Sequence, residues 1–137
     1  MLYPMAALVL LTFFVALMML KARIQAVHNK DVSIKYFKSY DQPARELPER
    51  MVITQRCYNN LLEIPPLFYA VCLAALALHS TGVIMAVLAW LYVACRVVQA
   101  AIHLGRNNVI WRMRVFLLSN LVLLAMWTYM VIAYAAR

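Results

Sequence analysis

Residues Leu2 to Leu20 read LYPMAALVLLTFFVALMML and carry no charged side chain. A helix needs about 20 apolar residues to cross the ~30 Å hydrocarbon core of a bilayer, so this run predicts a membrane span. A secretory signal peptide would begin with basic residues and end at a small-residue cleavage site, and this run has no leading lysine or arginine. We therefore expect the segment to be retained as the first transmembrane helix.

Three further apolar stretches follow, and together the four predict an all-α integral membrane protein. The expected spans are residues 2–20, 53–78, 83–104 and 115–136. The chain is 66% hydrophobic and 13% charged, and a soluble globule of 137 residues cannot hide that much apolar surface from water. The same length predicts a single domain over residues 1–137. The short connection HSTG, residues 79–82, predicts that the second and third spans form an antiparallel hairpin.

Most of the net charge of +8 lies in or beside two connections between the spans. The first, residues 21–50, contains Pro43 and Pro48 and should be irregular near its tip; the third covers residues 105–114. By the positive-inside rule, both basic connections are cytoplasmic and both termini lie on the opposite side. The cations flank apolar runs rather than forming an RNA- or DNA-binding motif, so no nucleic-acid partner is expected.

One helical face of the second span is polar. Arg56, Asn60 and Glu63 are spaced i, i+4 and i+7, which places them on one stripe. Pro65 and Pro66 follow, and because proline has no amide hydrogen, two carbonyls one turn earlier lose their partners. The helix should therefore bend just beyond Glu63 and open space beside the stripe. In the plainer alternatives, Arg56 extends to the lipid headgroups and Glu63 is a structural partner of an arginine.

A second polar stripe lies on the third span. Arg96, Gln99 and His103 are spaced i, i+3 and i+7, and Arg112 stands at the entrance of the fourth span on the same side of the membrane. A charged side chain at bilayer depth costs at least about 2.5 kcal/mol, so such residues should face protein or a wet cavity. The two stripes predict a polar pocket in the inner third of a helix bundle. For His103, a position near the interface without a functional role is the alternative.

The three cysteines lie in apolar helical stretches and lack the spacing of a zinc site or a CxxC motif. They are Cys57, Cys72 and Cys95. We expect buried thiols, with neither a disulfide framework nor a metal site.

The stretch Arg56–Phe68, RCYNNLLEIPPLF, resembles the helix-two signature of the MAPEG family, the membrane-associated proteins in eicosanoid and glutathione metabolism. That signature reads R-A-x-x-N-x-x-E-x-x-P-x-F, and only its alanine is replaced here, by Cys57. The four spans, the long basic first connection and the minimal second one extend the resemblance over essentially the whole chain. The third span, LYVACRVVQAAIH, is similar to the bacterial branch of the family.

The resemblance implies a homotrimer of left-handed four-helix bundles with glutathione, the cosubstrate, bound in clefts between subunits. Carried over, Arg56 would pair with a glutathione carboxylate, Asn60 would bond its backbone and Glu63 would hold the γ-glutamyl ammonium. Gln99 and His103 are assigned to the same site. The bacterial branch implies the inner membrane, with periplasmic termini.

A cationic side chain near the glutathione sulfur would lower the pKa of the thiol and raise its reactive fraction. Arg96 and Arg112 are assigned this catalytic role. The resemblance leaves open which of Arg106, Arg112 and Arg114 corresponds to the thiolate-stabilising arginine of the family.

Three functions fit the sequence. The first is a glutathione transferase or peroxidase acting on lipophilic electrophiles or lipid hydroperoxides. The second is a non-catalytic MAPEG-like scaffold that binds a lipid or a partner; it is favoured by Val97 and Ala101, which stand where leukotriene-forming members have tyrosines. The third is a proton-coupled exporter, which the position of Glu63 in the second span disfavours because such proteins carry the key carboxylate in the first.

Overall fold

The computed structural model describes residues 1–40 and 46–136, and all regular structure in that part of the chain is helical. The elements are α1 (Leu2–His28), α2 (Tyr36–Ser39), α3 (Glu49–Glu63), α4 (Pro65–Ala77), α5 (Val83–Leu104) and α6 (Val109–Ala135). Within the described residues, four helices are long and apolar enough to cross a membrane: α1, α3 with α4, α5, and α6. The expected all-helical, four-span membrane architecture is confirmed.

The first connection is shorter and more ordered than the polar loop expected over residues 21–50. Helix α1 continues beyond Leu20 to His28, α2 forms one helical turn, and α3 already begins at Glu49. The helix is closed by backbone hydrogen bonds, which polar residues form as well as apolar ones, so α1 extends past the end of its apolar run. The irregular tip expected around Pro43 lies outside the described residues.

Helix α6 also begins earlier than its apolar run, at Val109 rather than at residue 115. The reason is an N-cap that the apolar pattern does not reveal. The side-chain oxygen of Asn108 accepts hydrogen bonds from the backbone amides of Ile110 (3.1 Å) and Trp111 (3.2 Å). Such a cap satisfies amides that the first turn of a helix leaves without partners.

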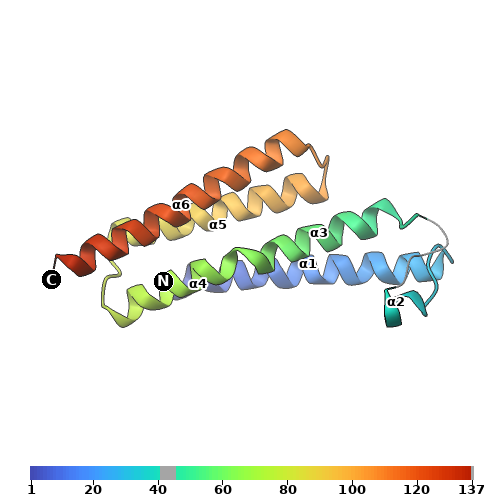
Figure 1. Ribbon diagram of the computed structural model, residues 1–137, viewed down its shortest axis with the longest axis horizontal. Coiled ribbons are helices and arrows are strands. Elements are labelled where there is room, and N and C mark those ends of the chain that lie inside the picture. The colour runs from blue at the N-terminus through green and yellow to red at the C-terminus, as the bar shows by residue number, and fades with distance from the viewer. Residues whose placement is uncertain (41–45, 137) are drawn as a thin grey trace.

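The four spans alternate in direction, so the connections fall at two ends of the bundle (Figure 1). The start of α1, the α4–α5 connection and the end of α6 lie at one end, and the first and third connections lie at the other. The most extensive packing joins α5 to α6 and α1 to α3. The second and third spans are antiparallel, as expected from their short connection; α3 packs on α5, while α4 packs mainly on α6 and α1.

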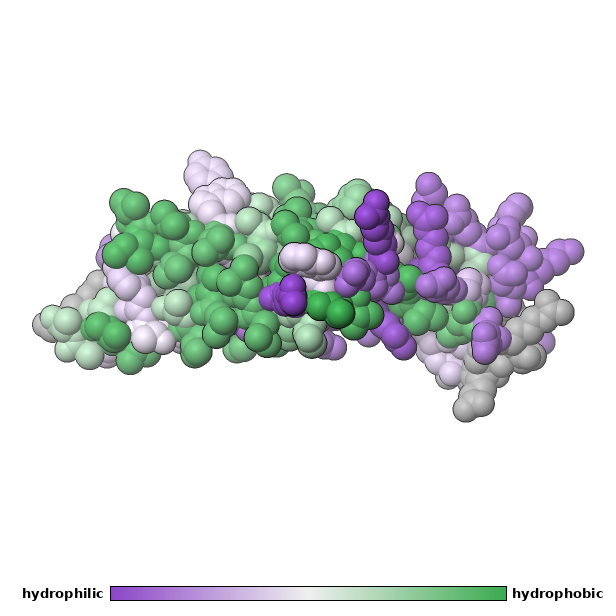
Figure 2. All heavy atoms as spheres, turned by 90° about the horizontal axis from the view of Figure 1, so that it is seen from above, coloured by the Kyte–Doolittle hydropathy of each residue, from purple (hydrophilic) through white to green (hydrophobic). Residues whose placement is uncertain are grey.

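Hydrophilic residues gather toward the end that holds the first connection, whereas hydrophobic residues cover most of the rest of the visible face (Figure 2). Large apolar side chains also stand exposed along the spans, among them Phe13 on α1 and Leu124 on α6. In a membrane these surfaces meet lipid or other subunits, so their exposure carries no penalty there.

The expected break in the second span is present at Ile64, between α3 and α4. Pro65 occupies the first turn of α4, where its missing amide hydrogen and fixed φ suit a helix start. The amide of Leu67 donates to the Ile64 carbonyl (3.0 Å) and closes that turn. Just beyond the break, the buried Phe68 ring stacks on Tyr92 of α5 with centroids 4.6 Å apart. The second span therefore consists of two helices, α3 and α4, and both contact the core.

Candidate functional site

A buried polar cluster joins α3 to α5, and we call it the Arg96 centre: Asn60, Arg96 and Gln99. Arg96 is only 1% exposed and Gln99 is 4% exposed. The Nη1 group of Arg96 donates to Gln99 Oε1 (2.7 Å), and its Nη2 donates to both the backbone oxygen (2.7 Å) and Oδ1 (2.8 Å) of Asn60. Gln99 Nε2 donates to the same Oδ1 (2.9 Å), which closes the network.

These hydrogen bonds fix the orientation of the Asn60 amide. A guanidinium only donates, so the Asn60 atom that faces Arg96 must be oxygen. The Gln99 amide donates to that oxygen as well, while its own oxygen accepts from Arg96. The Asn60 Nδ2 group, with two hydrogens, therefore points away from the centre and is available as a donor.

The space behind the Arg96 centre is closed. It leaves no room for a water molecule. Its remaining lining residues come from the facing sides of α3 and α5: Cys57, Leu61, Ala100 and His103. His103 is buried, and its Nε2 has no hydrogen-bond partner among the described residues. The structure thus brings His103 to the cluster, but on the side away from the open surface.

An open cavity of about 270 Å³ lies on the other side of the Arg96 centre. It is formed where α3, α5 and the first turns of α6 meet, and it is lined by Asn60, Gln99, Val109, Arg112, Met113 and Phe116. The cavity therefore presents a guanidinium and two carboxamide side chains against an apolar wall from α6. Such a combination suits a small polar ligand that also has an apolar part.

The structure separates the three arginines that the sequence left open. Arg112 lines the cavity, and its Nη1 donates to Asn107 Oδ1 (2.8 Å). Arg106 and Arg114 are exposed and do not line it, and the Arg114 guanidinium lies 5.3 Å from the centroid of the Trp111 ring. Among the three, Arg112 is the one placed beside Asn60.

The three residues of the polar stripe on α3 differ in their surroundings. Asn60 reaches inward to Arg96, whereas Arg56 and Glu63 are exposed on the surface of the single chain. The three stripe residues lie on the second of the four spans. The MAPEG family model matches residues 1–132. The chain belongs to the MAPEG family. No curated protein and no solved structure matches it.

The MAPEG family includes glutathione transferases and peroxidases as well as non-catalytic members, and it generally uses glutathione. Together with the four spanning helices, this membership makes the chain an integral membrane protein. Its three cysteines are all buried, as expected from the sequence. The thiol of Cys57, which stands where the MAPEG signature has alanine, faces the closed space behind the Arg96 centre.

Two turn residues of this MAPEG protein were not singled out from its sequence. Asn107, which holds Arg112, has a φ of 48°, a left-handed conformation that asparagine tolerates better than most residues. At Gly105 a Cβ atom would lie 2.9 Å from the carbonyl oxygen of Ala101, so the turn requires glycine there. The sequence signal is the run GRNN, whose glycine and asparagines are typical of a tight turn.

Proposed function

We propose that this MAPEG protein is a glutathione transferase or peroxidase that acts on lipophilic electrophiles or lipid hydroperoxides. The observation that carries the proposal is the shared cavity of Asn60 and Arg112, in which an amide donor of fixed orientation stands beside a guanidinium. Glutathione offers carboxylates, carbonyls and a thiol that becomes an anion, and each of these accepts hydrogen bonds.

The exposed positions of Arg56 and Glu63 support a site completed by a second subunit. Both side chains lie on the same face of α3 as the entrance to the cavity that Asn60 lines. In a homotrimer of these single-domain chains, a neighbouring subunit would cover this face and partly desolvate the two charges. Arg56 would then pair with a glutathione carboxylate and Glu63 with the ammonium group.

The nucleophile in this proposal is the thiolate of glutathione, stabilised by Arg112. In transfer, the thiolate forms a C–S bond to the electrophile while the leaving group departs with its electron pair. In peroxide reduction, the thiolate attacks the terminal peroxide oxygen and the O–O bond breaks, which yields a glutathione sulfenic acid and an alkoxide that takes a proton from water to become the alcohol. A second glutathione then forms the disulfide and releases water. Arg96, buried and held by three acceptors, acts as a positioning residue that orients Asn60.

The proposed orientation places the basic end of the bundle in the cytoplasm of a bacterium and the helix ends opposite it in the periplasm. The positive-inside rule supports this arrangement, because Lys and Arg residues concentrate at the first and third connections. The polar cosubstrate would enter from the cytoplasm, and the lipophilic substrate would arrive laterally from the inner membrane.

Replacing Arg56 or Glu63 with alanine is expected to weaken glutathione binding by about tenfold or more, because each loses a charge-assisted hydrogen bond. Titration calorimetry of the purified oligomer measures the effect. Arg50→Ala and Glu49→Ala are matched controls, since both residues are exposed near the start of the same helix. Absence of saturable binding to the wild-type protein, or equal losses in the controls, would contradict the proposal.

Replacing Arg112 with leucine is expected to raise the pKa of the bound glutathione thiol by about one unit, because a positive charge beside the sulfur is lost. At a pH below that pKa, the thiolate fraction falls about tenfold for each unit of this rise. The ultraviolet absorbance of the thiolate reports it directly. Arg114→Leu, which removes an exposed arginine outside the cavity, should leave the thiolate unchanged, and an equal loss in both variants would exclude the assignment to Arg112.

A non-catalytic role remains the second candidate, and one observation favours it. Val97 and Ala101, which replace the helix-three tyrosines of some members, are exposed on α5 and offer no hydroxyl to a ligand. A protein of this second kind would bind glutathione or lipid in the same cavity without turnover of model electrophiles. Steady-state assays with saturating glutathione separate the two roles.

A further inference from the structure

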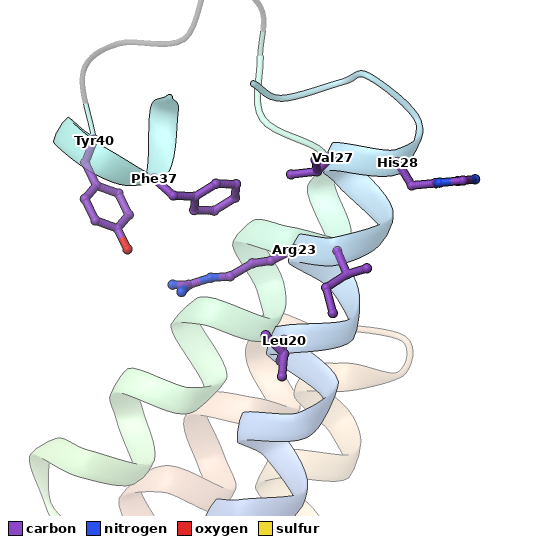
Figure 3. A pocket seen from close by; sticks show the side chains of 7 residues that line it. Leu20, Arg23, Val27, His28, Phe37 and Tyr40 are labelled. Carbon is purple, nitrogen blue, oxygen red and sulfur yellow. The ribbon is translucent and has the colours of Figure 1, made fainter. Parts of the chain in front are cut away.

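A second cavity lies between the end of α1 and α2, and it shares no lining residue with the cavity beside the Arg96 centre. Its volume is about 650 Å³, and its lining is Leu20, Arg23, Ile24, Val27, His28, Phe37 and Tyr40. Figure 3 shows the side chains of Phe37 and Tyr40 directed toward Arg23, while His28 points away. The cavity thus has aliphatic side chains on α1, two aromatic rings on α2 and one guanidinium between them.

Arg23 keeps an unused donor at this cavity. Its Nη2 donates to Gln55 Oε1 on α3, and its guanidinium carbon lies 5.7 Å from the centroid of the Phe37 ring. Its Nε group is buried but has no acceptor among the described residues. The partner of the guanidinium on α3 is a neutral amide, so its positive charge at the cavity favours an anionic ligand.

The cavity stands at the level where α1 leaves the hydrocarbon. The uncharged run of α1 ends at Leu20, and at 1.5 Å per residue it is long enough to cross about 30 Å of hydrocarbon. The next turn, with Arg23 and Ile24, therefore lies among the lipid headgroups. The rings of Tyr36, Phe37 and Tyr40 pack edge to face around α2, and aromatic residues are typical of this level of a membrane protein.

The surroundings are strongly cationic. Residues 20–40 contain one acidic residue, Asp31, and several basic ones: Lys21, Arg23, Lys30, Lys35 and Lys38. The four lysines are exposed. Basic residues beside a transmembrane helix attract anionic lipids, and the aliphatic wall distinguishes this site from one suited to a free anion.

From these observations we infer that the cavity between α1 and α2 binds a phospholipid with an anionic headgroup. The phosphate lies against the guanidinium of Arg23, and the headgroup lies beside Phe37 and Tyr40. The first acyl carbons follow Leu20 and Ile24 toward the hydrocarbon. The site is distinct from the glutathione cavity and does not depend on the proposed enzymatic activity.

The experiment compares lipid binding by the full-length, delipidated protein in native mass spectrometry. The probes are phosphatidylglycerol and phosphatidylcholine with identical acyl chains, and the readout is the ratio of their affinities. Arg23→Gln removes the cation, and Ile24→Trp fills the cavity without changing the charge at a side chain that is 59% exposed. Arg114→Gln is the matched control, because it removes another arginine stacked on an aromatic ring but outside the cavity. Glutathione binding is titrated in parallel.

Wild-type protein should prefer phosphatidylglycerol. Arg23→Gln should lower this preference about tenfold because a charge-assisted hydrogen bond to the phosphate is lost. Ile24→Trp should lower it about as much because the indole ring occupies the space of the headgroup. Arg114→Gln should change it by less than about twofold, because an isolated surface charge is screened. The inference is overturned if Arg23→Gln or Ile24→Trp keeps the preference, or if Arg114→Gln reduces it equally. It is also overturned if Arg23→Gln weakens glutathione binding and leaves lipid selectivity intact.

Discussion

Replacement of Arg96 with methionine is expected to lower the free energy of unfolding by roughly 1.5–6 kcal/mol and to weaken glutathione binding about tenfold or more. Three hydrogen bonds from this charged donor contribute roughly 1.5–3 kcal/mol each. The sum of these three contributions is reduced by about 3 kcal/mol, because the variant no longer places a charge at membrane depth. Without Arg96, the Asn60 amide loses the contacts that fix its orientation. Detergent-induced unfolding followed by circular dichroism, and titration with glutathione, measure the two effects.

Arg96→Lys sharpens this prediction. A lysine keeps the positive charge but cannot match the planar fork with which the guanidinium reaches Asn60 and Gln99 together, so it should not restore stability. Arg114→Met provides the control, since it removes an exposed arginine from α6. Full rescue by lysine would show that the centre needs only a charge, and wild-type stability of Arg96→Met would show that the network contributes nothing.

Asn60→Asp is expected to weaken glutathione binding about a hundredfold while leaving the fold at least as stable. One carboxylate oxygen still accepts from Arg96 and Gln99, and the new ion pair compensates a buried charge. The other oxygen replaces the Nδ2 donor at the cavity, so it repels the acceptors of the ligand and leaves them unpaired, a change of roughly 2–4 kcal/mol. Glutathione titration and thermal unfolding of the same samples separate binding from stability.

Asn59→Asp is the matched control for this variant. Asn59 is the preceding residue on α3, it is exposed, and it carries the same side chain. Its substitution adds the same charge without touching the Arg96 centre, so binding should change by less than about threefold. A similar loss in both variants would mean that only the local charge matters, and unchanged binding in Asn60→Asp would exclude a donor role for its amide.

Helical spacing predicted which polar residues share a face, but not which of them meet a neighbouring helix. Arg56, Asn60 and Glu63 form one stripe in sequence, yet only Asn60 contacts Arg96. The difference depends on the rotation of α3 against α5, which arises from packing of the whole core and leaves no signal in the spacing of one helix. The break at Ile64 was predictable, because two prolines remove amide hydrogens whatever the tertiary structure.

The choice among three arginines depended on a turn rather than on a helix. Arg112, which lines the cavity, is hydrogen-bonded to the left-handed Asn107 and follows the cap at Asn108, and turn geometry of this kind is poorly encoded in hydrophobic patterns. The same reason explains why α6 begins before its apolar run. The short connection at residues 79–82 predicted the antiparallel direction of the second and third spans, but a connection does not fix which helices share the largest interface.

The break at Ile64 has a mechanical consequence. The second span consists of two helical segments, α3 and α4, that meet at Ile64, because the prolines interrupt the backbone hydrogen bonding there. The end of α3 that carries Asn60 is hydrogen-bonded to Arg96 of α5, while α4 packs on α6. A bend at Ile64 would therefore move α4 and its contacts with α6 more than the Asn60 end of α3. The contacts between α4 and α6 would then change while the Arg96 centre keeps its hydrogen bonds.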